Sequence, residues 1–297
     1  MKHSPHPDPD LPELMPNHLV SSTINAGVQT IEMLSVETRN ALSLDLQQAI
    51  LTALEQGRAN GAKVVVLKGC KEAFSSGYNV NPTGRKDYVA QDDIFADCDR
   101  LSVFADFMKK VRSHPMPVIS QIQGYCVAGG TDLMLSSDIA LAADTARIGV
   151  PNVRGLGISM LATTWPMIIG PMRTKLMMFT GDLISGVQAA EWGLVASAVP
   201  VDDIDRVTLD LAKRIALMPA SLLVVTKLAA NRAMDIQGLD ALIRAGVELD
   251  AMAHFTQPVV EFWKRARGEG LKSALRERDA HFFGNDFSAI LRSGAKS

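Results

Sequence analysis

Two different spacings of hydrophobic residues divide the chain. In the first half, short apolar runs at 64–67, 118–122 and 139–142 are rich in β-branched residues and are typical of buried strands. Between these runs, residues 43–57 and 92–112 carry apolar side chains at helical spacing. Because strands and helices alternate, this half is predicted to have an α/β fold.

From about residue 160 onward the spacing is almost entirely helical, and one short strand, 195–199, is the exception. The alternation of strands and helices ends near residue 200, after that strand, which predicts a mixed core, residues 17–200, followed by a helical C-terminal region, residues 201–297. Helices are expected over 171–180, 185–192, 202–217, 219–234, 238–255, 256–267 and 270–283.

The first residues of the chain have a composition of their own. Residues 1–16 contain five prolines and several acidic side chains, which predicts a disordered leader. Residues 18–28 and 29–34 then read as two strands of a hairpin around Asn25-Ala26-Gly27. Ser43 stands where the N-cap of the following helix is expected.

Composition narrows the classes of partner. The 297 residues are 47% hydrophobic and carry a net charge of -2, so no basic surface for nucleic acid is expected. No apolar run reaches the roughly 18 residues that a membrane span needs. The three cysteines form no paired motif, and no His/Cys/Asp cluster has the spacing of metal ligands. We therefore expect a cytoplasmic protein with no metal.

Two glycine-bearing loops follow predicted strands. The loop 73–80 comes after the strand 64–67, and the loop 124–133 comes after the strand 118–122 and opens a helix. Glycine lets the backbone approach a ligand closely, and the N–H groups of Gly129 and Gly130 would lie unpaired at the positive end of that helix. Two N–H groups from two such loops, aimed at one point, would form an oxyanion hole.

These loops carry a family resemblance. The order Pro117-Val118-Ile119, Gly124-Tyr125, Ala128-Gly129-Gly130-Thr131-Asp132-Leu133 and Ser137-Asp138-Ile139 resembles the signature of the crotonase (enoyl-CoA hydratase/isomerase) superfamily. The resemblance runs from about residue 18 to residue 283, and the combination of motifs is specific although each piece is not. Further matching segments are Arg39-Asn40-Ala41-Leu42, Ala73-Phe74-Ser75-Ser76-Gly77, Phe179-Thr180-Gly181 and Ala189-Ala190-Glu191-Trp192-Gly193-Leu194-Val195.

The resemblance implies a fold and a substrate class. It implies a spiral core of repeated ββα turns with a helical C-terminal region that assembles a homotrimer or homohexamer. It implies a coenzyme A thioester as substrate, with no separate cofactor, whose carbonyl oxygen lies between the backbone N–H groups of Tyr78 and Gly129. Such an oxyanion hole stabilises the thioester enolate. The residues that would contact coenzyme A are Arg39, Ala41, Ser76, Asn79 and Val80.

The acid–base positions depart from the family pattern. Hydratases of this family place one carboxylate in the helix after the second loop and another about 20 residues later. Here these positions hold Asp132 and Asn152. Asn152 can orient a water or a substrate oxygen, but it cannot exchange a proton near neutral pH. Asn79 stands where the first loop usually has Asp, and the aspartate of dienoyl-CoA isomerases is replaced by Met160.

Three hypotheses about function follow. The leading one is hydration or dehydration across the α,β double bond of an acyl-CoA. The second is a family reaction that needs one carboxylate, namely double-bond isomerisation, decarboxylation, or hydrolytic or retro-aldol C–C cleavage. The third is a weakly catalytic acyl-CoA-binding paralogue. Among the residues with no predicted catalytic role, Tyr125 is interpreted as a core residue and His254 as a packed or solvated side chain of a helix.

Overall fold

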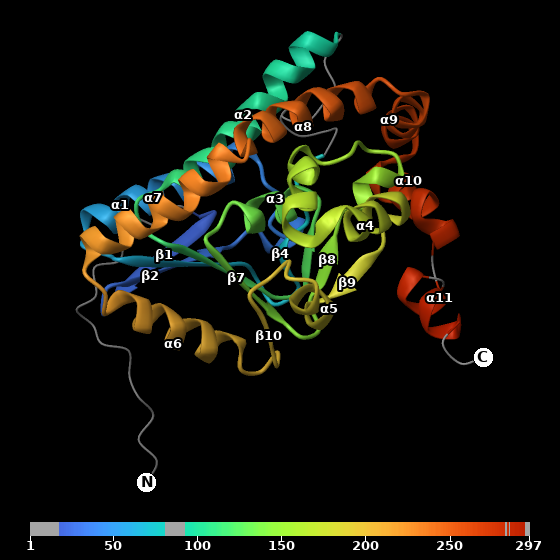
Figure 1. Cartoon of the computed structure of the whole chain (residues 1–297). Helices are drawn as coiled ribbons and strands as arrows, with labels where there is room; N and C mark the ends of the chain where they lie inside the picture. Colours follow the sequence, from blue (N-terminus) through green and yellow to red (C-terminus); the bar gives the residue numbers. More distant parts are fainter. Residues whose placement is uncertain (1–17, 81–92, 283, 285, 295–297) are drawn as a thin grey trace.

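A computed structural model describes residues 18–80, 93–282, 284 and 286–294, so the predicted leader lies outside the described residues. Its larger sheet runs in the order β1-β2-β3-β5-β7-β10, with β1 antiparallel to β2 and the other neighbours parallel. This sheet forms the centre of the molecule (Figure 1). Its strands are β1 (Val20–Asn25), β2 (Val28–Met33), β3 (Val64–Lys68), β5 (Val118–Ile122), β7 (Ile139–Ala143) and β10 (Ser197–Val199).

A smaller sheet lies next to the larger one, in the order β4-β6-β8-β9. Each of β3, β5 and β7 is followed in the chain by one strand of this smaller sheet, which is the repeated ββα turn that the family resemblance implied. The predicted spiral α/β fold is confirmed. The strands of the smaller sheet are too short to leave a hydrophobic period in the sequence: β4 (Ala73–Ser75), β6 (Tyr125–Val127), β8 (Arg147–Gly149) and β9 (Leu183–Ser185).

The N-terminal hairpin and the first helix form as predicted. Ala26 and Gly27 both have positive φ, as a tight hairpin turn requires, although Val28 belongs to the second strand and not to the first. The Ser43 hydroxyl accepts a hydrogen bond of 3.1 Å from the Leu46 N–H and caps helix α1 (Leu44–Ala59).

The helices after residue 160 follow the predicted order and have approximately the predicted bounds, with two differences. Helix α4 starts at Trp165 and not at residue 171. It consists of two helical pieces that meet at a kink at Gly170, directly before Pro171. A final helix, α11, was not predicted. The helices are α2 (Ile94–Ser113), α3 (Gly129–Leu135), α4 (Trp165–Thr180), α5 (Gly186–Glu191), α6 (Ile204–Ala216), α7 (Ala220–Ile236), α8 (Leu239–His254), α9 (Gln257–Glu269), α10 (Leu271–Asp279) and α11 (Phe287–Gly294).

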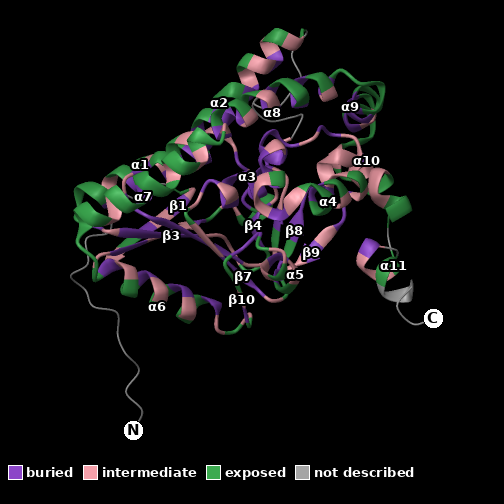
Figure 2. Cartoon of the chain, viewed as in Figure 1, coloured by how far each residue is buried: buried purple, intermediate pink, exposed green. Residues whose placement is uncertain are grey.

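Helices cover both faces of the larger sheet, and its central strands β3 and β5 are almost completely buried (Figure 2). Helix α6 packs its Ala212 and Ala216 against Val64, Val66 and Ile119 on one face. The larger cluster on the other side joins α1, α2, α3, α4 and α8 to the strands. No helix among the described residues is long and apolar enough to cross a membrane.

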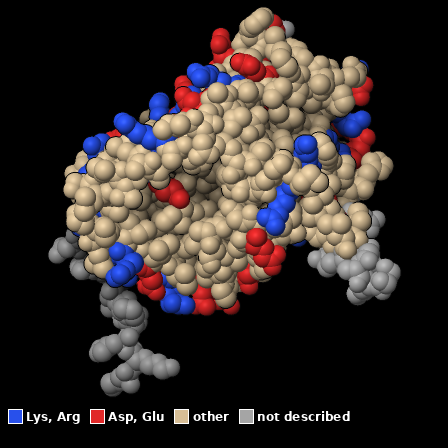
Figure 3. Space-filling model, viewed as in Figure 1, with Lys and Arg blue, Asp and Glu red and all other residues tan. Residues whose placement is uncertain are grey.

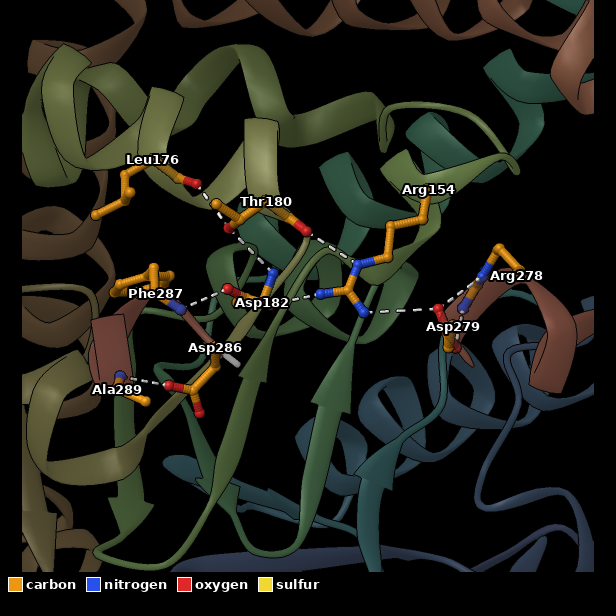
Figure 4. Close-up of polar contacts among 9 residues, drawn as sticks. All are labelled: Arg154, Leu176, Thr180, Asp182, Arg278, Asp279, Asp286, Phe287 and Ala289. Carbon is orange, nitrogen blue, oxygen red and sulfur yellow. Dashed lines mark hydrogen bonds and ion pairs between the residues drawn. The ribbon is translucent and has the colours of Figure 1, made fainter. Parts of the chain in front are cut away.

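An arginine ties the C-terminal region to the core. Arg154 ends the short 3-10 helix Pro151–Arg154, and its guanidinium binds Asp182 at 2.5 Å and Asp279 at 3.6 Å (Figure 4). The ring of Phe282 lies 3.9 Å below the same guanidinium. Asp182 also accepts the N–H of Phe287, at the start of α11. The turn that carries Asn152 is thereby fixed to the last helices of the chain.

We expect Arg154→Ala to destabilise the fold by about 3 kcal/mol, because it leaves the buried Asp182 carboxylate without the cation that it binds. Urea unfolding followed by circular dichroism measures the loss. Arg206→Ala is the matched control: Arg206 also pairs with two aspartates, but on the surface, so no measurable loss is expected. Equal effects of the two substitutions would contradict the role of Arg154.

Candidate active site

The second glycine loop leads into helix α3 with a strained residue. Ala128, the N-cap, has φ 50° and ψ -123°, a conformation that an L-residue adopts only when its surroundings enforce it. The Ala128 N–H donates to the Gly149 carbonyl at 3.0 Å and holds the backbone in place. Gly129 is then the first residue of α3, so its N–H has no carbonyl within this helix to bind. This is the position that the oxyanion-hole prediction requires of Gly129.

The first glycine loop lies directly against this helix start. Gly77 has φ 97°, and a Cβ added to it would lie 2.9 Å from the Ala128 Cβ and 3.2 Å from the Gly129 nitrogen. The ring of Tyr78 covers Gly129, where an added Cβ would meet ring carbons at 2.7 Å. Glycine is therefore the residue that fits at both positions. The two loops that carry the predicted oxyanion donors, Tyr78 and Gly129, are in contact, while their joint role stays a prediction.

The candidate coenzyme A residues come from two segments that are hydrogen-bonded to each other. The Leu42 N–H donates to the Gly77 carbonyl at 2.7 Å, and the Ser76 N–H donates to the Arg39 carbonyl at 2.9 Å. The Ser76 hydroxyl donates to the Thr38 carbonyl at 2.8 Å. Arg39, Ala41 and Ser76 are therefore neighbours, as their proposed common ligand would require.

The two remaining candidate residues for coenzyme A, Val80 and Asn79, lie at the end of the first glycine loop. Val80 is partly buried against the apolar cluster that includes Leu156, and Asn79 is half-buried beside it in the chain. The Arg39 guanidinium lies 5.5 Å from the centre of the Tyr125 ring. Tyr125 is 41% exposed, so its interpretation as a core residue was wrong: β6 begins at this residue, and its side chain points to the surface.

Asp132 is fully buried, and a hydroxyl group holds each of its carboxyl oxygens. The Tyr78 hydroxyl donates to Oδ2 at 3.1 Å, and the Ser159 hydroxyl donates to Oδ1 at 2.7 Å. The sequence pointed to Tyr78 only for its backbone N–H, and it did not point to Ser159 at all. No motif marks Ser159, which is brought to Asp132 by a backbone with φ 69°.

This environment changes the acidity of Asp132. The pKa of its carboxyl is raised to about 7, mainly by burial and to a smaller extent by the nearby Asp250. Hydrogen bonds from Ser159, Tyr78 and the Leu161 backbone act in the opposite direction. A carboxyl whose pKa lies near neutrality can both take and give a proton at neutral pH, which is the property of a general acid–base catalyst.

Asn152 lies on the 3-10 helix Pro151–Arg154, and its Nδ2 donates to the Gly157 carbonyl at 3.4 Å. Its Oδ1 is buried and has no hydrogen-bond partner among the described residues. Within that part of the chain, no hydrogen bond joins Asn152 to Asp132. Its free acceptor is consistent with a residue that orients a water or a substrate group, and this role stays a prediction.

Comparison with known proteins tests the family resemblance. The family model for enoyl-CoA hydratase/isomerase matches residues 23–283. A rat protein named enoyl-CoA hydratase domain-containing protein 3, mitochondrial, is 28% identical over 73% of this chain and 71% of its own. A hydroxycinnamoyl-CoA hydratase-lyase from Pseudomonas fluorescens is 29% identical over 66% of this chain and 72% of its own.

Solved structures resemble the fold over nearly the whole chain. The enoyl-CoA hydratase of Mycobacterium smegmatis superimposes with a TM-score of 0.82 at 31% identity, covering 90% of this chain and 95% of that one. An enoyl-CoA hydratase/isomerase from Xanthobacter autotrophicus Py2 superimposes with a TM-score of 0.76 at 28% identity, covering 89% and 98%. These similarities establish the fold of the chain and the family to which it is related.

We expect Asp132→Asn to raise the melting temperature at pH 8, because the raised pKa of Asp132 means that its ionised form is destabilised by the fold. In the unfolded chain this carboxyl titrates near 3.8 and in the folded chain near 7, so the penalty builds up between these pH values. Calorimetry from pH 4 to pH 8 should therefore show an advantage of the variant that grows with pH. An advantage that does not vary with pH would contradict the perturbed pKa.

Proposed function

The chain belongs to the enoyl-CoA hydratase/isomerase family, and from this premise we propose that it catalyses the reversible hydration of an enoyl-CoA thioester, with Asp132 as its acid–base group. The observation that carries the proposal is the buried Asp132 carboxyl with Tyr78 and Ser159 on its two oxygens. Tyr78 and Asp132 also come from the two loops that are in contact at the start of α3.

One carboxyl group is enough for this reaction. Ionised Asp132 takes a proton from water while the water oxygen bonds to the β-carbon, and the electrons of the double bond move onto the thioester oxygen as an enolate. Asp132 then returns the same proton to the α-carbon and is ionised again. The sum of the two steps is the addition of one water molecule. A pKa of about 7 suits both steps, because the carboxyl changes its protonation state twice in each cycle.

The enolate oxygen is the second requirement. In this proposal the N–H groups of Tyr78 and Gly129 bind it, and the positive end of the α3 dipole adds to their effect. Asn152 orients the attacking water through its unpaired Oδ1. Arg39, Ala41, Ser76, Asn79 and Val80 form the binding region for coenzyme A, with Arg39 facing its phosphates. Coenzyme A is part of the substrate, so no other cofactor takes part, and a cytoplasmic location remains the expectation.

A second candidate function rests on the residue at position 152. Asn152 replaces the carboxylate that would complete a pair, and Tyr78 and Ser159 bring hydroxyl groups to Asp132 and no second carboxylate. Such a site also suits a reaction that moves one proton at the α-carbon, namely double-bond isomerisation, or a decarboxylation or C–C cleavage that ends in the same enolate. A binder without turnover would leave the raised pKa of Asp132 without a use.

Incubation with a panel of enoyl-CoA thioesters separates these functions. Hydration adds the mass of water and removes the ultraviolet absorbance of the conjugated double bond; isomerisation changes only the spectrum; cleavage yields two fragments. We expect hydration, and we expect Tyr78→Phe to lower kcat/KM at pH 7 about 10-fold, because it removes one hydrogen bond to the Asp132 carboxylate.

Tyr125→Phe is the control for this variant, because it removes a phenol hydroxyl from β6 and keeps the ring below Arg39. Its kcat/KM should stay unchanged. Absence of every product with the wild-type protein would refute the proposed function. Hydration with equal rates for Tyr78→Phe and the wild type would keep the function and remove Tyr78 from it.

The helical C-terminal region supports a proposal about assembly. Helices α7 and α8 expose large apolar side chains, among them Leu222, Val225, Ile236 and Met252. Figure 3 shows a face on which uncharged side chains predominate and charged ones lie mainly along the rim. Such a surface is typical of a subunit interface. We propose that these helices assemble the homotrimer, or the homohexamer made of two trimers, that the family resemblance implies.

Sedimentation equilibrium tests the assembly. We expect a mass of three or six times the 32.0 kDa of the chain, and we expect Val225→Glu to yield a smaller species, because it places a charge in the proposed interface. Lys213→Glu on the exposed side of α6 changes the charge by two without entering this surface, so it should leave the mass unchanged. A stable wild-type monomer would contradict the proposal.

A further inference from the structure

A buried acid–histidine array, formed by Asp97 and Arg100 of α2 with Asp250 and His254 of α8, lies close to Asp132 without touching it. His254 Nδ1 lies 2.7 Å from Asp97 Oδ2, and His254 Nε2 lies 3.7 Å from Asp250 Oδ1. Arg100 binds the other oxygen of Asp97 at 2.6 Å. The side chains of Asp97, Asp250 and His254 are almost completely inaccessible to solvent. The array therefore joins α2 and α8 deep in the protein.

The array holds one short piece of backbone, residues 157–159. The Ile158 N–H donates to Asp250 Oδ1 at 2.7 Å. Gly157, with φ 127°, packs directly on the array: an added Cβ would collide with Asp250 Oδ1 and would lie 2.9 Å from His254 Nε2. The absence of a side chain at residue 157 is what allows this contact.

The same backbone carries Ser159, whose hydroxyl donates to Asp132 Oδ1 at 2.7 Å. Ser159 has φ 69°, a strained conformation that persists only where neighbouring contacts enforce it. We propose that the array is a positioning device: Asp97, Arg100, His254 and Asp250 clamp residues 157–159 and so fix the Ser159 hydroxyl on the acid–base carboxyl of Asp132. The inference rests on the proposed function of Asp132 and adds residues that act through another residue.

A merely structural explanation of the array is weak on energetic grounds. Burying charged groups costs several kcal/mol for each ion, and apolar side chains of similar volume would stabilise α2 against α8 at least as well. Asp250 Oδ2 is buried without a hydrogen-bond partner among the described residues, a cost that a purely structural contact would avoid. A defined task for Asp250 at residues 157–159 explains why a carboxylate stands there.

The charges around Asp132 and Asp97 determine whether the pKa of each carboxyl is raised or lowered. Asp132 faces Tyr78, Cys126 and Asp250 as titratable neighbours. Burial raises the pKa of Asp250 as well, and the ionised form of Asp250 raises the pKa of Asp132. Burial works against ionisation of Asp97, but His254 and Arg100 outweigh it and lower the pKa of Asp97. The hydrogen bonds that link the array to Asp132 run through Ile158 and Ser159, so the coupling that we propose is positional and electrostatic.

Two substitutions should move the pH dependence in opposite directions. Asp250→Asn keeps an acceptor for the Ile158 N–H and removes a negative charge near Asp132, so the acidic limb of kcat/KM should move to lower pH by about 0.5 unit or more. Ser159→Ala removes a donor that favours the ionised Asp132, so the limb should move to higher pH. Asp240→Asn, an exposed aspartate of the same helix, is the control and should not move it.

A second measurement does not depend on turnover. Amide hydrogen exchange of the peptide that covers residues 156–161 should become about 10-fold faster in His254→Gln and in Gly157→Ala, because both break the clamp. Gly155→Ala is the matched control. Gly155 has a similar φ of 131° and therefore takes similar backbone strain, but an added Cβ meets only one atom, at 4.0 Å, so exchange in this peptide should rise much less than in Gly157→Ala.

The outcomes separate this inference from the proposed function. If the wild type converts no acyl-CoA thioester, the proposed function fails, while faster exchange in His254→Gln and Gly157→Ala would still support the clamp. If the wild type is active, lower rates in Asp250→Asn and Ser159→Ala with an unmoved acidic limb would overturn the positioning role. Unchanged exchange in His254→Gln would overturn the clamp itself.

Discussion

The burial of one carboxyl group is the constraint on which the rest of the site depends. Asp132 has no contact with solvent, so its ionised form is stable only as far as the protein replaces the lost water with hydrogen bonds. Tyr78 and Ser159 supply these bonds from two different parts of the chain. Each can do so only if its own backbone is held in place, which explains why conformational strain gathers near Asp132, at Ala128 and at Ser159.

The spiral fold satisfies this constraint by repetition. Parallel strands place the loops after β4 and β6 next to each other, because β4 pairs with β6 in the smaller sheet. The turn after β8 then adds Asn152, and the 157–159 segment adds Ser159. The outer helices support these loops. Helices α2 and α8 do so through the buried array, and the C-terminal helices do so through Arg154. The site is thus supported by elements from almost the whole described chain.

The chemistry follows from what stands around Asp132 and from what is missing at position 152. A pair of carboxylates would divide the proton transfers of hydration between two groups, whereas this chain offers one carboxyl with a pKa near neutrality and two hydroxyl partners. Membership of the enoyl-CoA hydratase/isomerase family sets the class of substrate. The type of reaction then depends on which proton Asp132 moves. Hydration and the reactions that move one proton at the α-carbon are therefore the functions to compare.

The sequence by itself determined the order of the longer strands and of the helices up to α10, the hairpin, the Ser43 cap, and the placing of Gly129 and Asp132 at the start of a helix, because these depend on local spacing and on turn chemistry. It also carried the family motifs. Only the tertiary structure decided that the Tyr78 hydroxyl and Ser159 reach Asp132, that Tyr125 is exposed, and that His254 belongs to a buried array with Asp97 and Asp250. These contacts join residues far apart in the chain, and their formation depends on how helices pack, which no local period records.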